Sequence, residues 1–191
     1  MAGMSGGLCL WFTGLSGAGK TTLSRAVELQ LRALGHTVSI LDGDELRRSV
    51  NRDLGFSKAA RDENIARIAA LARDLVQEGH CVLVAAISPY AEARAQARAT
   101  IEAAGHFIEI HVDAPLELCI SRDPKGLYAR ALTGQLPGFT GIDDPYEPPP
   151  APDVLCDTSL DDVAACAVKV LAALHKKAAR STAGLSAPAR H

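Results

Sequence analysis

The stretch Gly14-Leu-Ser-Gly-Ala-Gly-Lys-Thr21 fits the pattern G-x-x-x-x-G-K-[ST] of phosphate-binding loops. An apolar run of strand length, Leu8–Thr13, precedes it, and residues 23–34 follow it with apolar side chains at helical spacing. The glycines allow successive backbone N–H groups to converge on a phosphate, and the helix N-terminus adds the positive end of its dipole. Because the pattern and both flanks are complete, we expect a nucleotide site rather than a glycine turn that only joins strand to helix.

Side chains of the loop have expected partners in a bound nucleotide. Lys20 would reach the β- and γ-phosphates, and the hydroxyl of Thr21 would ligate Mg²⁺. The loop residues predicted to bind the nucleotide are Gly14, Ser16, Gly17, Ala18, Gly19, Lys20, Thr21 and Thr22.

Length and composition predict one domain, which we place at residues 1–177. A chain of 191 residues buries roughly 70% of its unfolded surface. There is no apolar run of membrane-spanning length, and a net charge of −2 provides no electrostatic patch for nucleic acid or anionic lipid. We therefore expect no nucleic-acid partner and no membrane partner.

Cysteine usage and the N-terminus favour a cytoplasmic location. The five cysteines are scattered without a C-x-x-C pair, which predicts buried, reduced thiols, and the six histidines lack metal-ligand spacing. The first seven residues carry no positively charged region of the kind that opens a signal peptide.

Strand-like and helical segments alternate along the chain. The run Cys81–Ile87 is continuously apolar, which is typical of a parallel strand buried on both faces. The alternation predicts an α/β fold of the three-layer kinase type, with a five-stranded parallel sheet and helices on both faces. The remaining expected strands are 37–41, 106–112 and 153–156, and the longer expected helices are 58–78, 91–104 and 160–177. Ser57 and Ser159 are the expected N-caps of the first and last of these helices, and residues 178–191 are expected to be a disordered tail.

Two further segments are expected to face the phosphate loop. Asp42-Gly-Asp44 ends a strand, at the sheet edge where open α/β folds bind ligands. An ordinary turn with a helix cap is one interpretation; downstream of a phosphate loop we favour a carboxylate that contacts the metal or accepts a proton, namely Asp44. Residues 133–152 are rich in glycine and proline without periodicity, which predicts a lid spanning about 122–152. Its cations are Arg122, Lys125 and Arg130, and Arg122 is expected to contact the nucleotide.

Loop residues suggest a second ligand beside the donor nucleotide. Phe56 and Phe139 lie in glycine-rich segments near basic residues, which favours stacking on a nucleobase, whereas Tyr90 and Tyr146 are expected to pin their loops to the body. Ser88 is either an N-cap or a hydroxyl that faces the ligand cleft. An acceptor that is itself a nucleotide is therefore expected.

Several motifs make the chain resemble the adenosine 5′-phosphosulfate kinase (adenylylsulfate kinase) family. Besides the phosphate loop, they are Leu41-Asp-Gly-Asp44, Asn51-Arg-Asp-Leu-Gly-Phe-Ser57, Ile87-Ser-Pro-Tyr90, Arg122-Asp-Pro-Lys-Gly-Leu-Tyr128 and Phe139-Thr-Gly-Ile-Asp143. The two lid motifs are the most specific. The resemblance implies that the γ-phosphoryl of MgATP passes to the 3′-hydroxyl of adenosine 5′-phosphosulfate, with 3′-phosphoadenosine 5′-phosphosulfate and ADP as products of sulfate activation.

The resemblance also implies roles for individual residues. Phe56 and Phe139 would sandwich the acceptor adenine, and Asp44 would orient or deprotonate its 3′-hydroxyl. Ser88 matches a family serine described as able to accept phosphate. The residues that would bind the acceptor are Asp44, Arg47, Phe56, Arg61, Asn64, Ile87, Ser88, Lys125, Leu127, Phe139 and Ile142, and those expected in catalysis are Lys20, Asp44 and Ser88.

Three positions depart from the family pattern. Ala91, Ala129 and Leu132 stand where basic residues are common. Two alternatives follow: a related kinase that acts on another nucleotide-linked acceptor, or a non-catalytic nucleotide-binding module. The family tends towards homodimers, and an association with ATP sulfurylase is a further expectation.

Overall fold

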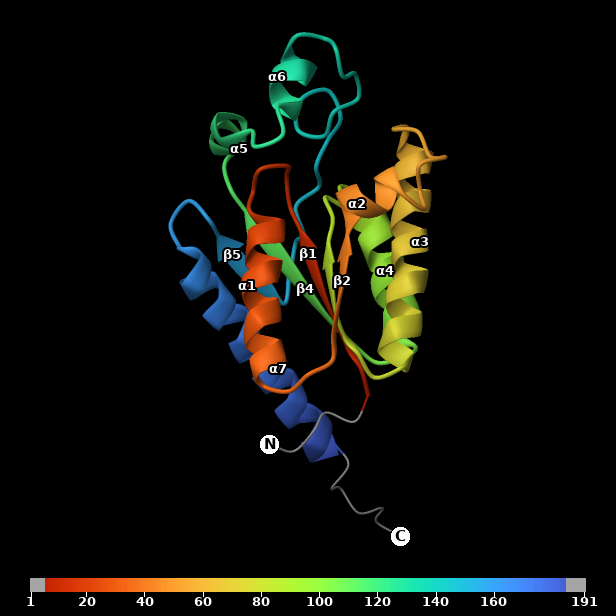
Figure 1. Cartoon of the computed structure of the whole chain (residues 1–191), viewed down its shortest axis with the longest axis vertical. Coiled ribbons are helices and arrows are strands. Elements are labelled where there is room, and N and C mark those ends of the chain that lie inside the picture. The colour runs from red at the N-terminus through yellow and green to blue at the C-terminus, as the bar shows by residue number, and fades with distance from the viewer. Residues whose placement is uncertain (1–5, 185–191) are drawn as a thin grey trace.

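Five strands form one parallel sheet in the computed structural model, which describes residues 6–184 (Figure 1). They are β1 (Leu8–Thr13), β2 (Val38–Asp42), β3 (Cys81–Ala85), β4 (His106–Asp113) and β5 (Val154–Asp157), in the order β2-β3-β1-β4-β5. Leu8 of the central strand pairs with both Cys81 and His106, and every pairing is parallel. The carboxyl ends of the strands therefore meet at one edge, below the lid. The predicted α/β fold is confirmed.

Two cores form because successive side chains of a strand point to opposite faces of the sheet. Helices α1 (Lys20–Ala33) and α7 (Val163–Gly184) cover one face, and α3 (Lys58–Gln77) and α4 (Ala91–Glu102) cover the other (Figure 1). From β1, Leu10 packs in the first core and Trp11 in the second, and all of β1 is buried. Burial on both faces explains why the central strands are continuously apolar.

The shorter helices lie above the sheet and around the lid. Helix α2 is Gly43–Arg48, α5 is Leu116–Arg122 and α6 is Leu127–Leu132. Helix α6 begins at Leu127, where the Asp123 carboxylate accepts hydrogen bonds from the backbone of Tyr128 and Ala129. Between α6 and β5 there is no helix or strand among the described residues, apart from an isolated bridge between Thr140 and Asp144.

Helix ends test the capping predictions. Ser57 caps α3 as predicted, since its hydroxyl accepts from Ala60 N at 3.2 Å. The prediction for Ser159 was wrong: α7 begins at Val163, and it is the Asp162 carboxylate that accepts from Ala165 N at 2.8 Å. Ser159 instead donates to the Asp157 carboxylate, which ends β5.

The C-terminal prediction was wrong in part. Helix α7 continues past Lys177 to Gly184, so residues 178–184 are helical rather than a disordered tail. The rest of the predicted tail, residues 185–191, lies outside the described residues. No helix within residues 6–184 is long and apolar enough to span a membrane. All five cysteines are buried and unpaired, as predicted.

Candidate active site

A cleft of about 1700 Å³ lies at the carboxyl edge of the sheet, between the phosphate loop and the lid. The lid, β3 and the α2–α3 segment all contribute to its walls. Of the predicted site residues, the cleft is lined by Ser16, Gly17, Ala18, Gly19, Lys20, Thr21, Thr22, Asp44, Arg47, Phe56, Arg61, Asn64, Ile87, Ser88, Arg122, Lys125, Leu127 and Phe139. Segments far apart in sequence thus share one cavity, as a two-substrate site requires.

The phosphate loop is shaped by backbone that favours glycine. Gly17 and Gly19 have φ angles of 77° and 105°, in the left-handed region that side chains rarely adopt. Gly14 does not line the cleft: a Cβ there would lie 2.2 Å from the carbonyl oxygen of Val112, so this glycine permits close packing against β4. Gly14 therefore shapes the loop, and its predicted contact with the nucleotide stays a prediction.

Lys20 is buried inside this loop. Its Nζ donates to the carbonyl oxygens of Gly14 (2.9 Å) and Leu15 (2.8 Å). Burial lowers the pKa of Lys20 to about 8, while the nearby Asp44 carboxylate raises it. A buried ammonium with only carbonyl partners is poised to gain from a phosphate anion.

Thr21 and Asp42 form an oxygen pair suited to Mg²⁺. The Thr21 hydroxyl donates to Asp42 Oδ2 at 3.1 Å, and Asp42 Oδ1 caps α2 by accepting from Asp44 N (2.9 Å) and Glu45 N (3.2 Å). The helix-cap interpretation of Asp42-Gly-Asp44 is thus confirmed for Asp42, and the role of Asp44 in metal contact or proton transfer stays a prediction. Hydroxyl and carboxylate oxygens are the ligands that Mg²⁺ prefers, so the residues present fit this ion.

Asp44 and Lys125 meet across the cleft. Lys125 Nζ donates to Asp44 Oδ2, and both side chains are about half exposed. The contact joins the lid to the first turn of α2. Because both groups face solvent, the pair adds little stability, and its value lies in positioning.

The arginines predicted to bind the acceptor also organise the surrounding loops. Arg47 Nη1 donates to Gly55 O at 2.8 Å, and its guanidinium lies 4.9 Å from the Phe56 ring centroid. Arg61 is buried and donates to Phe56 O (3.0 Å) and Thr140 Oγ1 (2.8 Å). Arg61 therefore ties α3 to the lid.

Asn64, on α3, is held by Asn51 from the loop before that helix. Its Oδ1 accepts from Asn51 Nδ2 at 3.0 Å, and both side chains are buried. This bond orients the Asn64 amide so that its Nδ2 donors remain for a ligand.

The two predicted base-stacking residues differ in burial. Phe56 is 54% exposed and Phe139 is 8% exposed, and the Phe139 ring packs edge-on against Tyr128 at 5.0 Å. The predictions for Tyr90 and Tyr146 are confirmed: Tyr90 donates to Asp144 Oδ1 at 2.8 Å, and Tyr146 shares a 3.0 Å hydrogen bond with Thr13.

Ser88 is not the N-cap of α4, because Tyr90 occupies that position. The Ser88 hydroxyl accepts a hydrogen bond from Trp11 Nε1 (3.1 Å) and donates one to Ala86 O (3.3 Å). Ser88 is only 1% exposed. Among the described non-glycine residues, Ser88 alone has a φ in the left-handed region, 43°. Backbone of this kind costs on the order of 1–3 kcal/mol, and it concentrates at functional sites.

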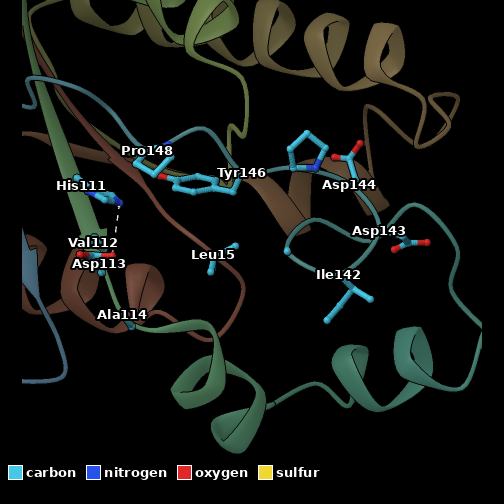
Figure 2. Close-up of a pocket in the computed structure, with 12 residues that line it drawn as sticks. Leu15, His111, Val112, Asp113, Ala114, Ile142, Asp143, Asp144, Tyr146 and Pro148 are labelled. Atoms are coloured by element: carbon cyan, nitrogen blue, oxygen red, sulfur yellow. Dashed lines mark ion pairs between the residues drawn. The ribbon is translucent and has the colours of Figure 1, made fainter.

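Ile142 lies apart from the cleft. It lines a separate pocket of about 540 Å³ together with His111 and Tyr146, whose rings stack at 5.9 Å (Figure 2). The Ile142 side chain therefore lies outside the cleft, and the prediction that the backbone near Ile142 helps to hold the acceptor stays a prediction. The turn that Ile142 N makes with Phe139 O at 3.0 Å directs the two side chains to different cavities.

Other cleft residues were missed by sequence reasoning. Arg52 lines the cleft next to the Phe56 loop, and Thr158 lines it after β5, where its hydroxyl donates to Ala18 O at 2.9 Å. Arg122, predicted to contact the nucleotide, donates to Thr158 Oγ1 at 3.0 Å. The rule that parallel strands end at the ligand edge would have found Thr158, which follows β5 directly. Arg52 carries no such signal.

A model of the family described as adenylylsulphate kinase matches residues 6–157. The chain belongs to this family. Adenylyl-sulfate kinases from Synechococcus sp. (strain JA-3-3Ab) and Myxococcus xanthus are 53% and 52% identical to it; the matches cover 88% and 92% of this chain and 94% and 95% of the relatives. This family member is therefore a kinase, and it matches these relatives over nearly their whole length.

A solved structure supports the same assignment. The Mycobacterium tuberculosis APS kinase in complex with AMPPNP and APS superposes with a TM-score of 0.86 and is 46% identical; the match covers 89% of this chain and 98% of that one. A hexameric APS kinase from Thiobacillus denitrificans matches with a TM-score of 0.70 and 35% identity, over 92% of this chain and 30% of that chain.

Proposed function

We propose that this protein transfers the γ-phosphoryl of ATP to the 3′-hydroxyl of adenosine 5′-phosphosulfate. Family membership, the names of relatives over 50% identical and the APS-bound neighbour support this function. The observation that carries it is that the phosphate loop and the Phe56/Phe139 pair line one cleft. A phosphate donor and an aromatic-bound acceptor then face each other.

The donor half of the site neutralises phosphate charge. Lys20 exchanges its two carbonyl partners for β- and γ-phosphate oxygens, while loop N–H groups orient the rest of the triphosphate. The Thr21 hydroxyl and the neighbouring Asp42 carboxylate would hold Mg²⁺, which would neutralise charge at the phosphates. Arg122 and Thr158 line the cleft at this end.

The acceptor half orients a hydroxyl. Phe56 and Phe139 hold the adenine, and Arg47, Arg61 and Asn64 hold the phosphosulfate. Asp44 accepts a hydrogen bond from the 3′-hydroxyl and removes its proton as the O–P bond forms, with ADP as leaving group. In the absence of acceptor, Lys125 neutralises Asp44, and acceptor binding redirects that ammonium to an acceptor oxygen. Direct transfer requires no phosphorylated Ser88, whose hydroxyl is committed to Trp11 and Ala86.

The test is a product assay with several acceptors. Purified protein is incubated with MgATP and adenosine 5′-phosphosulfate, and in parallel with AMP, other nucleoside monophosphates and shikimate-like alcohols. We expect a 3′-phosphorylated, sulfated product and an equal amount of ADP from the first mixture only. Turnover of another acceptor alone would identify a different kinase, and binding without any turnover would favour a non-catalytic module.

Removing Phe56 is expected to weaken acceptor binding specifically. Loss of one stacking ring costs about 1–3 kcal/mol per base, which is roughly 5- to 150-fold in the KM for adenosine 5′-phosphosulfate. Because Phe56 is largely exposed, Phe56→Ala should leave the thermal midpoint nearly unchanged. Phe139 is buried against Tyr128, so Phe139→Ala should both raise the KM and lower the thermal midpoint. Steady-state kinetics and a thermal melt of both variants provide the measurement; an unchanged KM in Phe56→Ala would contradict the stacking role.

The proposal extends to assembly and location. From the family resemblance we infer that the protein forms a homodimer and that it is located in the cytoplasm. We infer in addition that it associates with ATP sulfurylase. Light scattering measures the mass in solution, and cell fractionation with co-purification tests the other two statements. A monomer that is fully active would remove the dimer from the proposal.

A further inference from the structure

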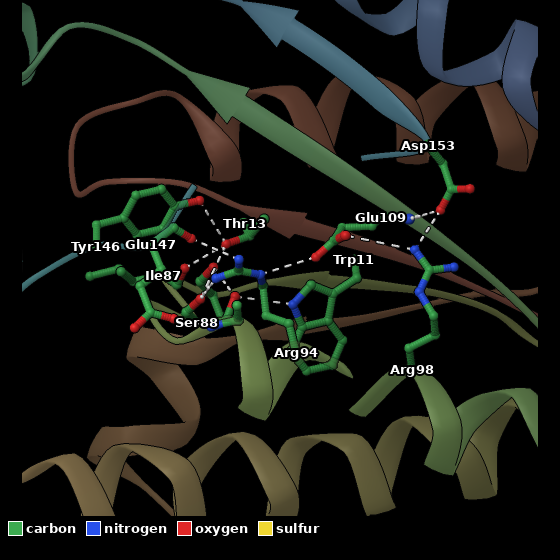
Figure 3. Close-up of polar contacts among 12 residues, drawn as sticks. Trp11, Thr13, Ile87, Ser88, Arg94, Arg98, Glu109, Tyr146, Glu147 and Asp153 are labelled. Atoms are coloured by element: carbon green, nitrogen blue, oxygen red, sulfur yellow. Dashed lines mark hydrogen bonds and ion pairs between the residues drawn. The ribbon is translucent and has the colours of Figure 1, made fainter. Parts of the chain in front are cut away.

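Arg94 is a buried cation outside the set of residues assigned to substrates. It lies on α4 and is 3% exposed, although arginine is seldom buried unless its donors are paired. Its guanidinium donates to Glu109 Oε1 (3.1 Å), Ser88 O (2.7 Å) and Glu147 O (2.7 Å), as Figure 3 shows. One side chain thus joins a strand, the loop after β3 and the end of the lid.

Glu109 holds the charge that makes this burial tolerable. On β4, Phe107 packs in the core beneath α3 and α4, and Glu109 and His111 follow on the same face at alternate positions. An apolar residue is the expected choice there. Glu109 is mostly buried and pairs with Arg94, and replacing such a pair with apolar residues is often neutral or stabilising. A role in positioning therefore explains the pair better than stability does.

The first group that Arg94 holds is the strained corner of the cleft. Ser88, with its positive φ, follows Ile87, and both line the cleft. Trp11 fixes the Ser88 side chain, Thr13 Oγ1 donates to Ile87 O at 2.7 Å, and Arg94 fixes Ser88 O. An unfavourable backbone conformation persists only where its surroundings over-determine it, and Arg94 supplies the charged contact.

The second group is the C-terminal anchor of the lid. Glu147 N donates to Pro89 O at 2.8 Å, and Glu147 Oε2 accepts from Ala91 N at 2.7 Å. Arg94 completes this anchor through Glu147 O. The lid end and the Ile87–Ser88 wall are consequently fixed to the same guanidinium.

We propose that Arg94, neutralised by Glu109, is a positioning residue that sets the Ile87–Ser88 wall of the acceptor site and couples it to the lid. This inference rests on the proposed function, since it names what aligns the acceptor in that reaction. Arg94 touches neither substrate. Its loss misplaces the wall and the lid end together, whereas none of its three hydrogen bonds is made to the phosphate loop.

Four variants test the role: Arg94→Met, Arg94→Lys, Glu109→Gln and the control Arg98→Met. Arg98 lies one turn further along α4 and pairs with Glu102, Asp153 and, at 3.7 Å, with Glu109 Oε2. Its variant therefore removes a similar side chain and one ion pair of Glu109, but leaves all three Arg94 hydrogen bonds. We expect kcat/KM for adenosine 5′-phosphosulfate to fall about 10²-fold in Arg94→Met, the size of effect that a misplaced site wall produces. The Kd for ADP, measured by calorimetry, should stay within about twofold, because ADP contacts the phosphate loop.

Arg94→Lys separates positioning from charge neutralisation. Lysine retains the charge opposite Glu109 but lacks the planar fork that reaches both carbonyl oxygens. We expect it to restore folding without restoring kcat/KM, and Glu109→Gln to lie between the parent and Arg94→Met. If Arg94→Met does not fold, these two variants carry the test alone.

Trp11 provides a spectroscopic readout of the corner. It is the only tryptophan of the chain, it is fully buried, and its Nε1 donates to Ser88. Its emission should shift in Arg94→Met and Arg94→Lys and stay unchanged in Arg98→Met. Parent-like kinetics with parent-like emission in Arg94→Lys would overturn the inference, and so would an equal loss of ADP and acceptor affinity. A parent protein that does not phosphorylate adenosine 5′-phosphosulfate would instead overturn the proposed function.

Discussion

Lys20→Met is expected to reduce phosphoryl transfer by about 10³-fold, the upper range for losing one preorganised donor at a charged transition state. Methionine keeps the length of the side chain and removes the ammonium that the phosphate loop buries. The thermal midpoint should not fall, because the variant removes a buried charge whose pKa of about 8 reflects an unfavourable environment. Rapid-quench assays with saturating substrates, together with a thermal melt, measure both quantities.

Lys176→Met is the matched control for this variant. Lys176 is an exposed lysine of α7 outside the cleft, so its replacement should leave transfer unchanged. Retention of more than a tenth of parental turnover by Lys20→Met would show that the loop, and not its lysine, supplies the charge stabilisation.

The same lysine predicts a pH dependence. In the free protein Lys20 titrates near pH 8, and only its protonated form attracts triphosphate. Because kcat/KM reports the free enzyme, its value for ATP should decline as the pH rises through about 8. Bound phosphates raise the pKa of Lys20, so kcat should hold to higher pH. A profile of kcat/KM that is flat to pH 9.5 would contradict the link to Lys20.

Local chemistry explains which features could be predicted from the sequence. The phosphate loop depends on contiguous residues and on glycines with positive φ, so the pattern itself carries the geometry. The strands are recognisable because burial on two faces demands continuous apolar runs, as in β1 and β3. The cap at Ser57 acts over three residues and is equally local.

Features that depend on distant partners could not be predicted. The Ser88 hydroxyl was assigned to a helix cap or a ligand, yet its partner is Trp11, 77 positions away. Arg61 resembled a ligand-binding arginine, and the structure adds its bond to Thr140 in the lid. Before α7, Ser159 and Asp162 are both residues that can cap a helix. Because the Ser159 hydroxyl donates to the Asp157 carboxylate at the end of β5, Asp162 caps the helix instead.

The family resemblance supplied what periodicity could not. The sequence pattern placed both carboxylates at the ligand edge and favoured Asp44, without deciding whether Asp44 contacts the metal or accepts a proton. The structure separates their surroundings: Asp42 contacts Thr21 and caps α2, whereas Asp44 faces Lys125 across the cleft. Asp44 is thus available to an acceptor hydroxyl, while Asp42 is committed to the donor side.

Asp44→Asn is accordingly expected to lower kcat by about 10²- to 10⁴-fold, the usual contribution of a general base. Asparagine keeps the size of the side chain and can still accept a hydrogen bond, but it cannot take the proton of the 3′-hydroxyl. The Asp44 carboxylate lies in the first turn of α2, where its charge interacts favourably with the helix dipole. Because it is half exposed, losing this interaction lowers the free energy of unfolding by only about 0.3–1 kcal/mol. The KM for ATP should change little, because the phosphate loop is untouched.

Asp53→Asn controls for the loss of a negative charge from the same region, since Asp53 is exposed, pairs with Arg67 and lies outside the cleft. Kinetics at saturating adenosine 5′-phosphosulfate compare the two variants, and Lys125→Met extends the comparison. If Asp44 acts as the base, Asp44→Asn should remain slow whether or not Lys125 is present. If Asp44 only holds Lys125 in place, the double variant should be no slower than Lys125→Met alone, and Asp44 would then be a positioning residue of the lid.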